Sequence, residues 1–317
     1  MDRRALLTGA LAAGTAALVE GCTTMTASDA SLFKRIDKPI GLQVYTLGDE
    51  AGADIDATFA TVAGIGYREI ELPGLYGKTA RELRAAADRA GLAITSLHVP
   101  LETRGRPGLS FASPAAEISE TVMTLGAANA VAPIALFPQG FRPAPGESIQ
   151  AAIGRAFNAA GAEPWLRSAA LINPVAVALK RLGVRVGYHN HNLEFAPIGD
   201  TTGWDILMRE FDPAVELEVD IGWIAAAGFD PVAFLAGQRR RVSQLHVKDV
   251  GAGNRINYAL AMTPAEVGSG TLDWARILPA ARAAGVEHFY VEQEPPFTIP
   301  RIEAARKSYG YLAALRA

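Results

Sequence analysis

Residues 187–191 read Gly-Tyr-His-Asn-His, the first of four segments in which an apolar run ends in residues that bind metals or transfer protons. The other three segments are Glu218-Val219-Asp220, Leu245-His246-Val247-Lys248-Asp249 and Tyr290-Val291-Glu292-Gln293-Glu294. A helix-like stretch fills each gap between them. This order predicts strands that alternate with helices and that all end at the same edge of one sheet.

Side-chain alternation places one residue from each segment on a common face. In a strand every second side chain points the same way. Two imidazoles and two carboxylates on that face would suit a divalent metal ion. Buried salt bridges without a metal are the alternative, since charged groups inside a sheet must be paired. The four predicted ligands are His189, Asp220, His246 and Glu292.

The composition is that of one globular α/β domain. Of the 317 residues, 50% are hydrophobic and 20% are charged, and barrels often exceed the usual domain size. The formal net charge is −3 and there is no long basic run, so we predict no nucleic acid partner. A single cysteine excludes an internal disulfide framework.

The N-terminus, residues 1–22, is predicted to be an export signal. Arg3-Arg4 precede a short apolar run and the small residues before Cys22, which is typical of such signals. The paired arginines predict twin-arginine export to the periplasm, and Cys22 is a candidate site for a lipid anchor. An ordinary N-terminal helix is the alternative. Residues 23–38, rich in Thr, Ser and Asp, are predicted to be a linker.

Residues 39–317 are predicted to form a single (β/α)8 TIM barrel. Near-continuous apolar runs are typical of parallel strands buried on both faces, and glycines end several of the helical stretches between them. A doubly wound open sheet is the alternative, but no glycine-rich dinucleotide fingerprint follows a strand. Strands are predicted at 40–47, 69–72, 94–99, 130–137, 184–195, 215–223, 242–250 and 288–292.

One segment interrupts this rhythm. Residues 137–165 contain several prolines with scattered glycine and polar residues. The segment follows the fourth strand on the side where barrel active sites lie, so we predict a loop with a short helix that covers the site. A plain surface excursion is the alternative.

The ends of the strands also carry acid/base candidates, because the C-terminal ends of barrel strands line the active site. Lys248 shares a face with His246, Glu294 shares one with Glu292, and His98 stands at a strand end. A lysine beside a metal can have a lowered pKa that suits proton abstraction. The predicted acid/base residues are His98, Lys248, Glu292 and Glu294, and the predicted substrate contacts are Gln43, Tyr45, Glu71, His191 and Trp223.

The sequence resembles the sugar phosphate isomerase/epimerase family, which has a xylose isomerase-like barrel. The resemblance runs from about Pro39 to the C-terminus, and Val267–Trp274 is similar to the family's Gly-x-Gly loop. It is carried by Leu42-Gln43-Val44-Tyr45-Thr46-Leu47, Glu69-Ile70-Glu71-Leu72, Ser96-Leu97-His98-Val99-Pro100, Tyr188-His189-Asn190-His191, Glu218-Val219-Asp220, His246-Val247-Lys248-Asp249 and Val291-Glu292.

The resemblance implies one divalent ion (Mn, Mg, Co or Zn) bound by Glu, Asp, His and Glu on strands five to eight. By position, Asp220, His246 and Glu292 match this set. Strand five departs from it, because His189 stands where the family usually has glutamate, and Glu194 is an alternative ligand. A metal-bound neutral imidazole is a poor proton shuttle, so the family's two-glutamate mechanism does not carry over directly.

The same superfamily contains apurinic endonucleases, which use three zinc ions and extra histidines. One such histidine would follow Asp220 by three residues, but this chain has Trp223 there. An indole cannot bind zinc, and the charge balance disfavours DNA. Trp223 is instead predicted to be an apolar wall or stacking platform for a sugar ring.

These observations imply a metal-dependent isomerase or epimerase acting on a sugar or keto-sugar. A base would remove a proton next to a carbonyl, and the metal would stabilise the resulting enediolate. A hydratase, dehydratase or lyase acting on a 3-keto-sugar through the same intermediate is the first alternative. A non-catalytic, exported sugar-binding protein is the second. Periplasmic export disfavours a phosphorylated substrate.

Overall fold

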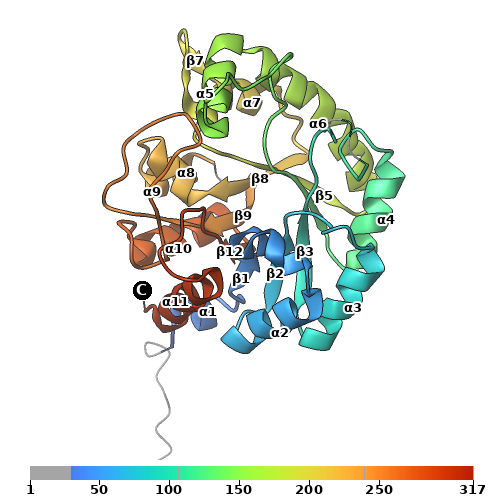
Figure 1. Cartoon of the computed structure of the whole chain (residues 1–317), viewed down its shortest axis with the longest axis vertical. Coiled ribbons are helices and arrows are strands. Elements are labelled where there is room, and N and C mark those ends of the chain that lie inside the picture. Colours follow the sequence, from blue (N-terminus) through green and yellow to red (C-terminus); the bar gives the residue numbers. More distant parts are fainter. Residues whose placement is uncertain (1–29, 104, 106, 239, 317) are drawn as a thin grey trace, which may run out of the picture.

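The computed structural model describes residues 30–103, 105, 107–238 and 240–316, and it confirms the predicted barrel (Figure 1). Parallel strands close in the order β1-β12-β9-β8-β5-β4-β3-β2, so all of them end at one face of the molecule. The strands are β1 (Gly41–Gln43), β2 (Glu69–Leu72), β3 (Ala93–His98), β4 (Asn129–Ala132), β5 (Arg185–His189), β8 (Val215–Asp220), β9 (Val242–Val247) and β12 (His288–Val291).

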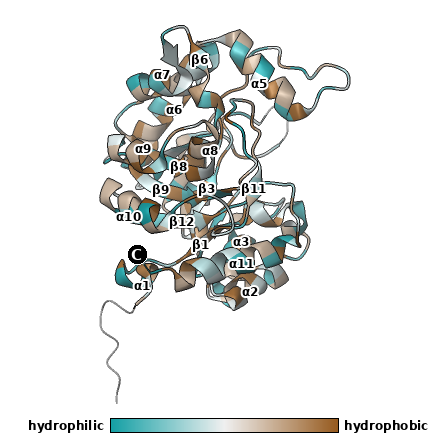
Figure 2. Ribbon diagram, turned by 90° about the vertical axis from the view of Figure 1, so that its left-hand side faces the viewer, coloured by the Kyte–Doolittle hydropathy of each residue, from teal (hydrophilic) through white to brown (hydrophobic). Residues whose placement is uncertain are grey.

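Helices lie around the outside of the strands, and Figure 2 shows hydrophilic and hydrophobic residues mixed along many of them. This mixture is typical of helices that cover a barrel, with one face packed on the strands and the other in water. The helices are α1 (Leu32–Arg35), α2 (Ile55–Ile65), α3 (Ala80–Ala90), α4 (Ala115–Leu125), α5 (Ile149–Ala160), α6 (Glu163–Arg181), α7 (Gly203–Glu210), α8 (Ile221–Ala226), α9 (Pro231–Gly237), α10 (Trp274–Ala284) and α11 (Arg301–Ala314).

Local sequence signals set the ends of these helices. At the start of α3 the Thr79 side chain accepts from the Glu82 amide, and Glu82 bonds back to Thr79, which forms a capping box. At its end Gly91 takes a left-handed backbone with φ 69°, which glycine adopts without steric cost. Gly285 ends α10 in the same way. Both glycine stops agree with the sequence prediction.

Several strands are shorter than predicted, because polar side chains at their ends start new elements. β1 stops at Gln43, where the chain enters a 3-10 turn. β8 stops at Asp220, whose Oδ1 accepts from the Trp223 amide at 2.9 Å and thereby caps α8. Trp223 therefore lies on a helix and not on the strand predicted at 215–223. After β9, Asp249–Val250 form β10, which pairs with β11 (Pro264–Ala265).

The folded domain begins before the boundary predicted at residue 39. Leu32 and Phe33 of α1 are buried, and the Leu32 amide donates to the Leu315 carbonyl at 2.8 Å. Figure 1 shows α1 beside α11, next to the C-terminus. The described part of the predicted linker, 30–38, thus belongs to the folded domain. The predicted export signal and Cys22 lie outside the described residues, so these stay predictions.

Within the part of the chain that the structure describes, no helix is both long and apolar enough to cross a membrane.

The inside of the barrel is strongly polar, whereas the layer between strands and helices is apolar. Apolar side chains such as Phe59, Leu83 and Leu278 are fully buried in that outer layer. Charged groups inside a barrel must be paired or bound to an ion, because their burial costs free energy. The polar interior therefore indicates a functional site. Its buried members include Gln43, Glu69, Glu71, Ser96, His98, Asn129, His189, Glu218, Asp220, Gln244, His246 and Lys248.

Asp249 shapes the loop after β10 and takes no part in the polar interior. Its Oδ1 accepts from the amides of Val250 at 2.8 Å and Leu272 at 3.2 Å. Its Oδ2 accepts from the Gly268 amide and from Trp274 Nε1, both at 2.9 Å. This fully buried carboxylate therefore holds the Gly-x-Gly loop against the barrel.

We predict that Asp249→Ala lowers the free energy of unfolding by about 3 kcal/mol or more, because several buried donors lose their acceptor. Urea unfolding measures this change. The control is Asp88→Ala, which removes an exposed pair with Arg84 and should change stability by about 0.5 kcal/mol or less. Equal stability of the two variants would contradict the structural role of Asp249.

Candidate metal and acid/base centre

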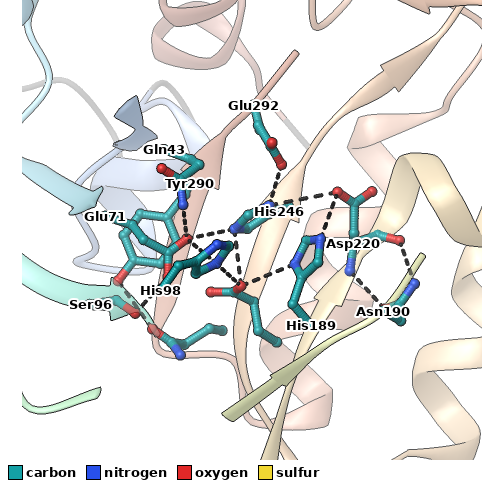
Figure 3. Close-up of polar contacts among 12 residues, drawn as sticks. Gln43, Glu71, Ser96, His98, His189, Asn190, Asp220, His246, Tyr290 and Glu292 are labelled. Atoms are coloured by element: carbon teal, nitrogen blue, oxygen red, sulfur yellow. Dashed lines mark hydrogen bonds and ion pairs between the residues drawn. The ribbon is translucent and has the colours of Figure 1, made fainter. Parts of the chain in front are cut away.

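Buried polar side chains converge at the C-terminal ends of the strands (Figure 3). Each comes from the last residues of a strand or from the position just after it, because parallel strands deliver those positions to one face. Gln43, Glu71, His98 and His189 come from β1, β2, β3 and β5. Glu218 and Asp220 come from β8, His246 from β9, and Glu292 follows β12.

The structure brings the four predicted ligands together. One donor atom from each of His189, Asp220, His246 and Glu292 lies within 4.8 Å of the others. Asp220 Oδ2 is 3.9 Å from His189 Nε2 and 3.6 Å from His246 Nδ1. Glu292 Oε2 is 2.5 Å from His246 Nδ1. All four side chains are buried, so their donor atoms are shielded from water.

The donor set fits a divalent cation. Asp220 Oδ2 is buried and has no hydrogen-bond partner within the described part of the chain, but it forms an ion pair with Lys248 Nζ at 2.9 Å and faces both imidazoles. An acceptor in that position is costly unless a cation satisfies it. Two nitrogen and two carboxylate donors also suit Zn, Mn or Co.

Lys248 lies in the same centre as a buried ammonium. Its Nζ is 2.9 Å from Asp220 Oδ2, 3.1 Å from Glu292 Oε2 and 3.2 Å from Glu294 Oε1. Burial would lower the pKa of Lys248, but these three carboxylates hold it well above its ordinary value. These contacts favour the charged ammonium of Lys248, and its predicted acid/base role beside a metal stays a prediction.

Glu294 lies toward the open side of the centre. Its Oε2 accepts from the Tyr45 hydroxyl at 3.1 Å, and Tyr45 is 41% exposed. Burial raises the pKa of Glu294, and the charge of Lys248 offsets this rise only in part. Glu294 thus combines access to solvent with a carboxyl that is more basic than usual.

Glu218 is the residue that the sequence prediction missed. Its Oε2 lies 2.9 Å from His98 Nε2, 3.1 Å from His189 Nδ1 and 3.2 Å from His246 Nε2. It belongs to a second group that could hold an ion, with His98, His189 and His246. Alternation along the strand does place Glu218 on the same face as Asp220. It does not predict which side chains Glu218 contacts.

Gln43 and Glu71 lie beneath the centre and not on its open side. Gln43 Nε2 donates to Glu71 Oε2 at 2.8 Å, and the Ser96 hydroxyl donates to Glu71 Oε1 at 2.6 Å. Glu71 Oε2 is also 2.7 Å from His246 Nε2. Both side chains are fully buried; Glu71 supports His246 and Gln43 supports Glu71, and their predicted role as substrate contacts stays a prediction.

The imidazoles differ in their affinity for protons. Burial would lower the pKa of His98, but the charges of Glu71 and Glu218 raise it to about 10. The pKa of His246 is likewise held well above its ordinary value, against burial, by Glu218 and Glu292. Burial and the neighbouring His246 lower the pKa of His189 well below its ordinary value. His98 is therefore a cation at neutral pH and cannot serve as a general base in that state.

His191 and Trp223 form one wall of the centre. The His191 ring is 4.9 Å from His189 and 5.4 Å from Trp223, and Lys248 Nζ lies 5.0 Å from the Trp223 ring centroid. Trp223 is only 3% exposed. Its ring is thus an apolar wall, as predicted, but one packed by neighbours and not an open stacking platform.

Glu194 is not the strand-five ligand. Its Oε1 accepts from the Tyr188 hydroxyl at 2.7 Å, and its Oε2 accepts from the His191 amide at 3.0 Å. It belongs to neither of the ligand groups found among the described residues. Of the two alternatives left open by the sequence, the structure selects His189.

A cavity of about 840 Å³ lies beyond the ends of β3 and β4, and none of its lining residues belongs to the centre. The loop predicted at 137–165 contains the short helix α5, as expected, and its first part lines this cavity. The cavity wall includes Pro100, Leu101, Ile134, Phe137, Phe141, Arg142 and Arg167.

The sequence and the fold both match known proteins. Residues 59–315 match the family model of the xylose isomerase-like TIM barrel. A sugar phosphate isomerase/epimerase from Parabacteroides distasonis is 24% identical, with a TM-score of 0.63 over 86% of this chain and 97% of that chain. No curated protein is similar enough in sequence to count as a match.

Two further solved structures have the same barrel. A 3-keto-D-glucoside 4-epimerase from E. coli is 19% identical, with a TM-score of 0.58 over 87% of this chain and 98% of that chain. A probable 3-DHS dehydratase from Bacillus anthracis is 14% identical, with a TM-score of 0.57 over 86% of this chain and 98% of that chain. At these identities the likeness establishes the fold and no particular substrate.

Glu194 generates a prediction on pH. Burial raises the pKa of this carboxyl to about 8, whereas an unfolded chain ionises it near about 4.3. Between these values the folded protein retains a proton that the unfolded chain has released, so its stability falls as pH rises. The contribution is on the order of 1 kcal/mol per pH unit.

We therefore expect Glu194→Gln to gain stability relative to wild type as the pH rises from 5 to 8. Urea unfolding at each pH unit measures the difference. The control is Glu117→Gln on an exposed face of α4, whose difference from wild type should stay constant. A constant difference for Glu194→Gln as well would contradict the raised pKa.

Proposed function

Because the chain belongs to the xylose isomerase-like TIM barrel family, we propose that it is a metal-dependent isomerase or epimerase acting on a sugar or keto-sugar. The observation that carries this proposal is the convergence of four buried donors within 4.8 Å of one another. A buried group of this kind at the C-terminal ends of the strands, in a barrel of this family, is typical of an active site. The donors are His189, Asp220, His246 and Glu292.

A divalent cation (Mn, Mg, Co or Zn) held by these donors would supply Lewis-acid stabilisation of the oxygen charge that develops during the reaction. Around it, Lys248 contributes a second fixed positive charge, since its ammonium contacts Asp220 and Glu292. The centre is thus suited to a reaction in which negative charge appears on a substrate carbonyl oxygen.

We assign the base to Glu294. Among the acid/base candidates it has the exposed side chain, 18% against 1% for Lys248, and its pKa is raised by burial. Lys248 is already protonated, His98 is a buried cation, and Glu292 is a predicted ligand. Glu294 would take a proton from the carbon next to the carbonyl, with Tyr45 holding its other oxygen. Returning the proton to another carbon or face gives an isomerase or an epimerase.

Elimination is the second candidate outcome. If a hydroxyl on the next carbon leaves after the same proton transfer, the result is a dehydratase or lyase acting on a 3-keto-sugar. The likeness to a 3-keto-D-glucoside epimerase and to a dehydratase is compatible with both outcomes.

We predict one divalent ion per chain after reconstitution of the purified protein. His246→Ala removes a central donor and is expected to abolish stoichiometric binding, as measured by elemental analysis. The control is His288→Ala, because this histidine lies at the start of β12 and bonds to Glu69 instead. Circular dichroism checks that both variants fold. Substoichiometric metal in the wild-type protein would exclude the metal-enzyme proposal.

Proton abstraction is tested by incubating the metal-loaded protein with sugars and keto-sugars in deuterated water. We expect label at the carbon next to the carbonyl, detected by NMR, and a loss of roughly a hundredfold or more in Glu294→Gln. Glu303→Gln, an exposed change on α11, should keep the wild-type rate. Binding of a sugar without any exchange would favour a sugar-binding protein instead.

A further inference from the structure

In each of His189 and His246, the ring nitrogen that faces away from Asp220 lies close to one oxygen of Glu218. We infer that Glu218 is a positioning residue that fixes which ring nitrogen of His189 and of His246 faces the bound ion. The inference rests on the proposed metal site and deepens it. Glu218 touches neither the open side of the centre nor Glu294, so its role is to act through the histidines.

Glu218 Oε2 forms hydrogen bonds with His98 and His189 and lies close to His246, whose Nε2 is hydrogen-bonded to Glu71. The Glu218 oxygen is 3.1 Å from His189 Nδ1, 3.2 Å from His246 Nε2 and 2.9 Å from His98 Nε2. These are ordinary lengths for N–H···O hydrogen bonds. The side chain is fully buried, so water does not compete for that oxygen.

The opposite nitrogens of the same two rings face the ligand carboxylates. His189 Nε2 is 3.9 Å from Asp220 Oδ2, and His246 Nδ1 is 3.6 Å from the same oxygen. Without an ion the charged form of His246 has two N–H groups, but an imidazole that binds an ion through one nitrogen keeps an N–H only on the other. When the N–H of each ring donates to Glu218, the lone pair of each ring must point to the ion, as in carboxylate–histidine–metal arrangements.

His189 depends on Glu218 more than His246 does. His246 Nε2 has a second carboxylate partner, Glu71 Oε2 at 2.7 Å. No second carboxylate contacts His189 Nδ1 among the described residues. Removal of the Glu218 charge should therefore release His189 first, because its ring loses the acceptor that orients it.

A second metal ion is the competing explanation, since His98, His189, Glu218 and His246 also lie close enough to hold one. Two ions would require both nitrogens of His189 and of His246 to bind metal, and neither ring could then keep its proton. One carboxylate oxygen that accepts from His98 and His189 and lies close to His246 explains the same distances without that cost. The number of ions per chain separates the two explanations.

The test compares affinity for Zn²⁺ and Co²⁺ in wild-type protein, Glu218→Gln and Glu216→Gln by chelator competition. In Glu218→Gln the amide oxygen is a neutral and therefore weaker acceptor for the ring N–H groups, so Kd should rise about 10- to 100-fold. Glu216 lies on the same strand, is partly exposed and pairs with Arg185 at 4.0 Å, so Glu216→Gln should bind like wild type. Glu218→Asp keeps the charge and should have an intermediate Kd. It also tests the inference if the Glu218→Gln variant does not fold.

The visible spectrum of bound Co²⁺ gives a second measurement that does not depend on activity. Loss or rotation of His189 in Glu218→Gln should shift the ligand-field bands, whereas Glu216→Gln should leave them unchanged. An unchanged Kd and spectrum in Glu218→Gln, or two ions per wild-type chain, would overturn the inferred role of Glu218 but not the proposed function. A wild-type protein that binds no ion would overturn the proposed function as well.

Discussion

The structure depends on the pairing of carboxylates that are buried inside the barrel. Glu71, Glu218 and Asp220 are fully buried and Glu292 nearly so, and an isolated charge in such a place would cost several kcal/mol. The compensating charges also come from the barrel, chiefly Lys248 and the histidines. The barrel therefore encloses a pre-arranged set of donors in place of the apolar layers that usually fill this fold.

The same residues connect the barrel to its surroundings. Asp220 offers Oδ2 to the centre while its Oδ1 caps α8, and its amide donates to Asn190 Oδ1 at 3.0 Å. Each of these contacts restricts the carboxylate to one orientation. Asp249 follows Lys248 directly in the chain, but its carboxylate binds the loop around Gly268. Neighbouring polar residues of one motif thus have different roles, one in the centre and one in the fold. These supporting contacts hold the donors of the centre in fixed positions.

The histidine in strand five acquires a physical explanation. The family resemblance implies a glutamate there, which would place its charge directly on the ion. In this chain His189 stands at that position and Glu218 stands behind it, 3.1 Å from Nδ1. The negative charge is retained but lies one imidazole ring away. In the proposed reaction such a ligand would not carry a proton back and forth, so we assign proton transfer to Glu294, a carboxylate on the open side with the exposure for it.

The barrel and most of the donor set could be predicted from the sequence alone. Alternation along a strand and the shared direction of parallel strands are local rules, and they brought His189, Asp220 and His246 to one face. Only the tertiary structure decided the partners of each group. It excluded Glu194, surrounded Lys248 with carboxylates and placed Glu218 against three imidazoles. Pairing and pKa depend on distances across several strands, which follow from register and closure of the barrel and not from the periodicity of any single strand.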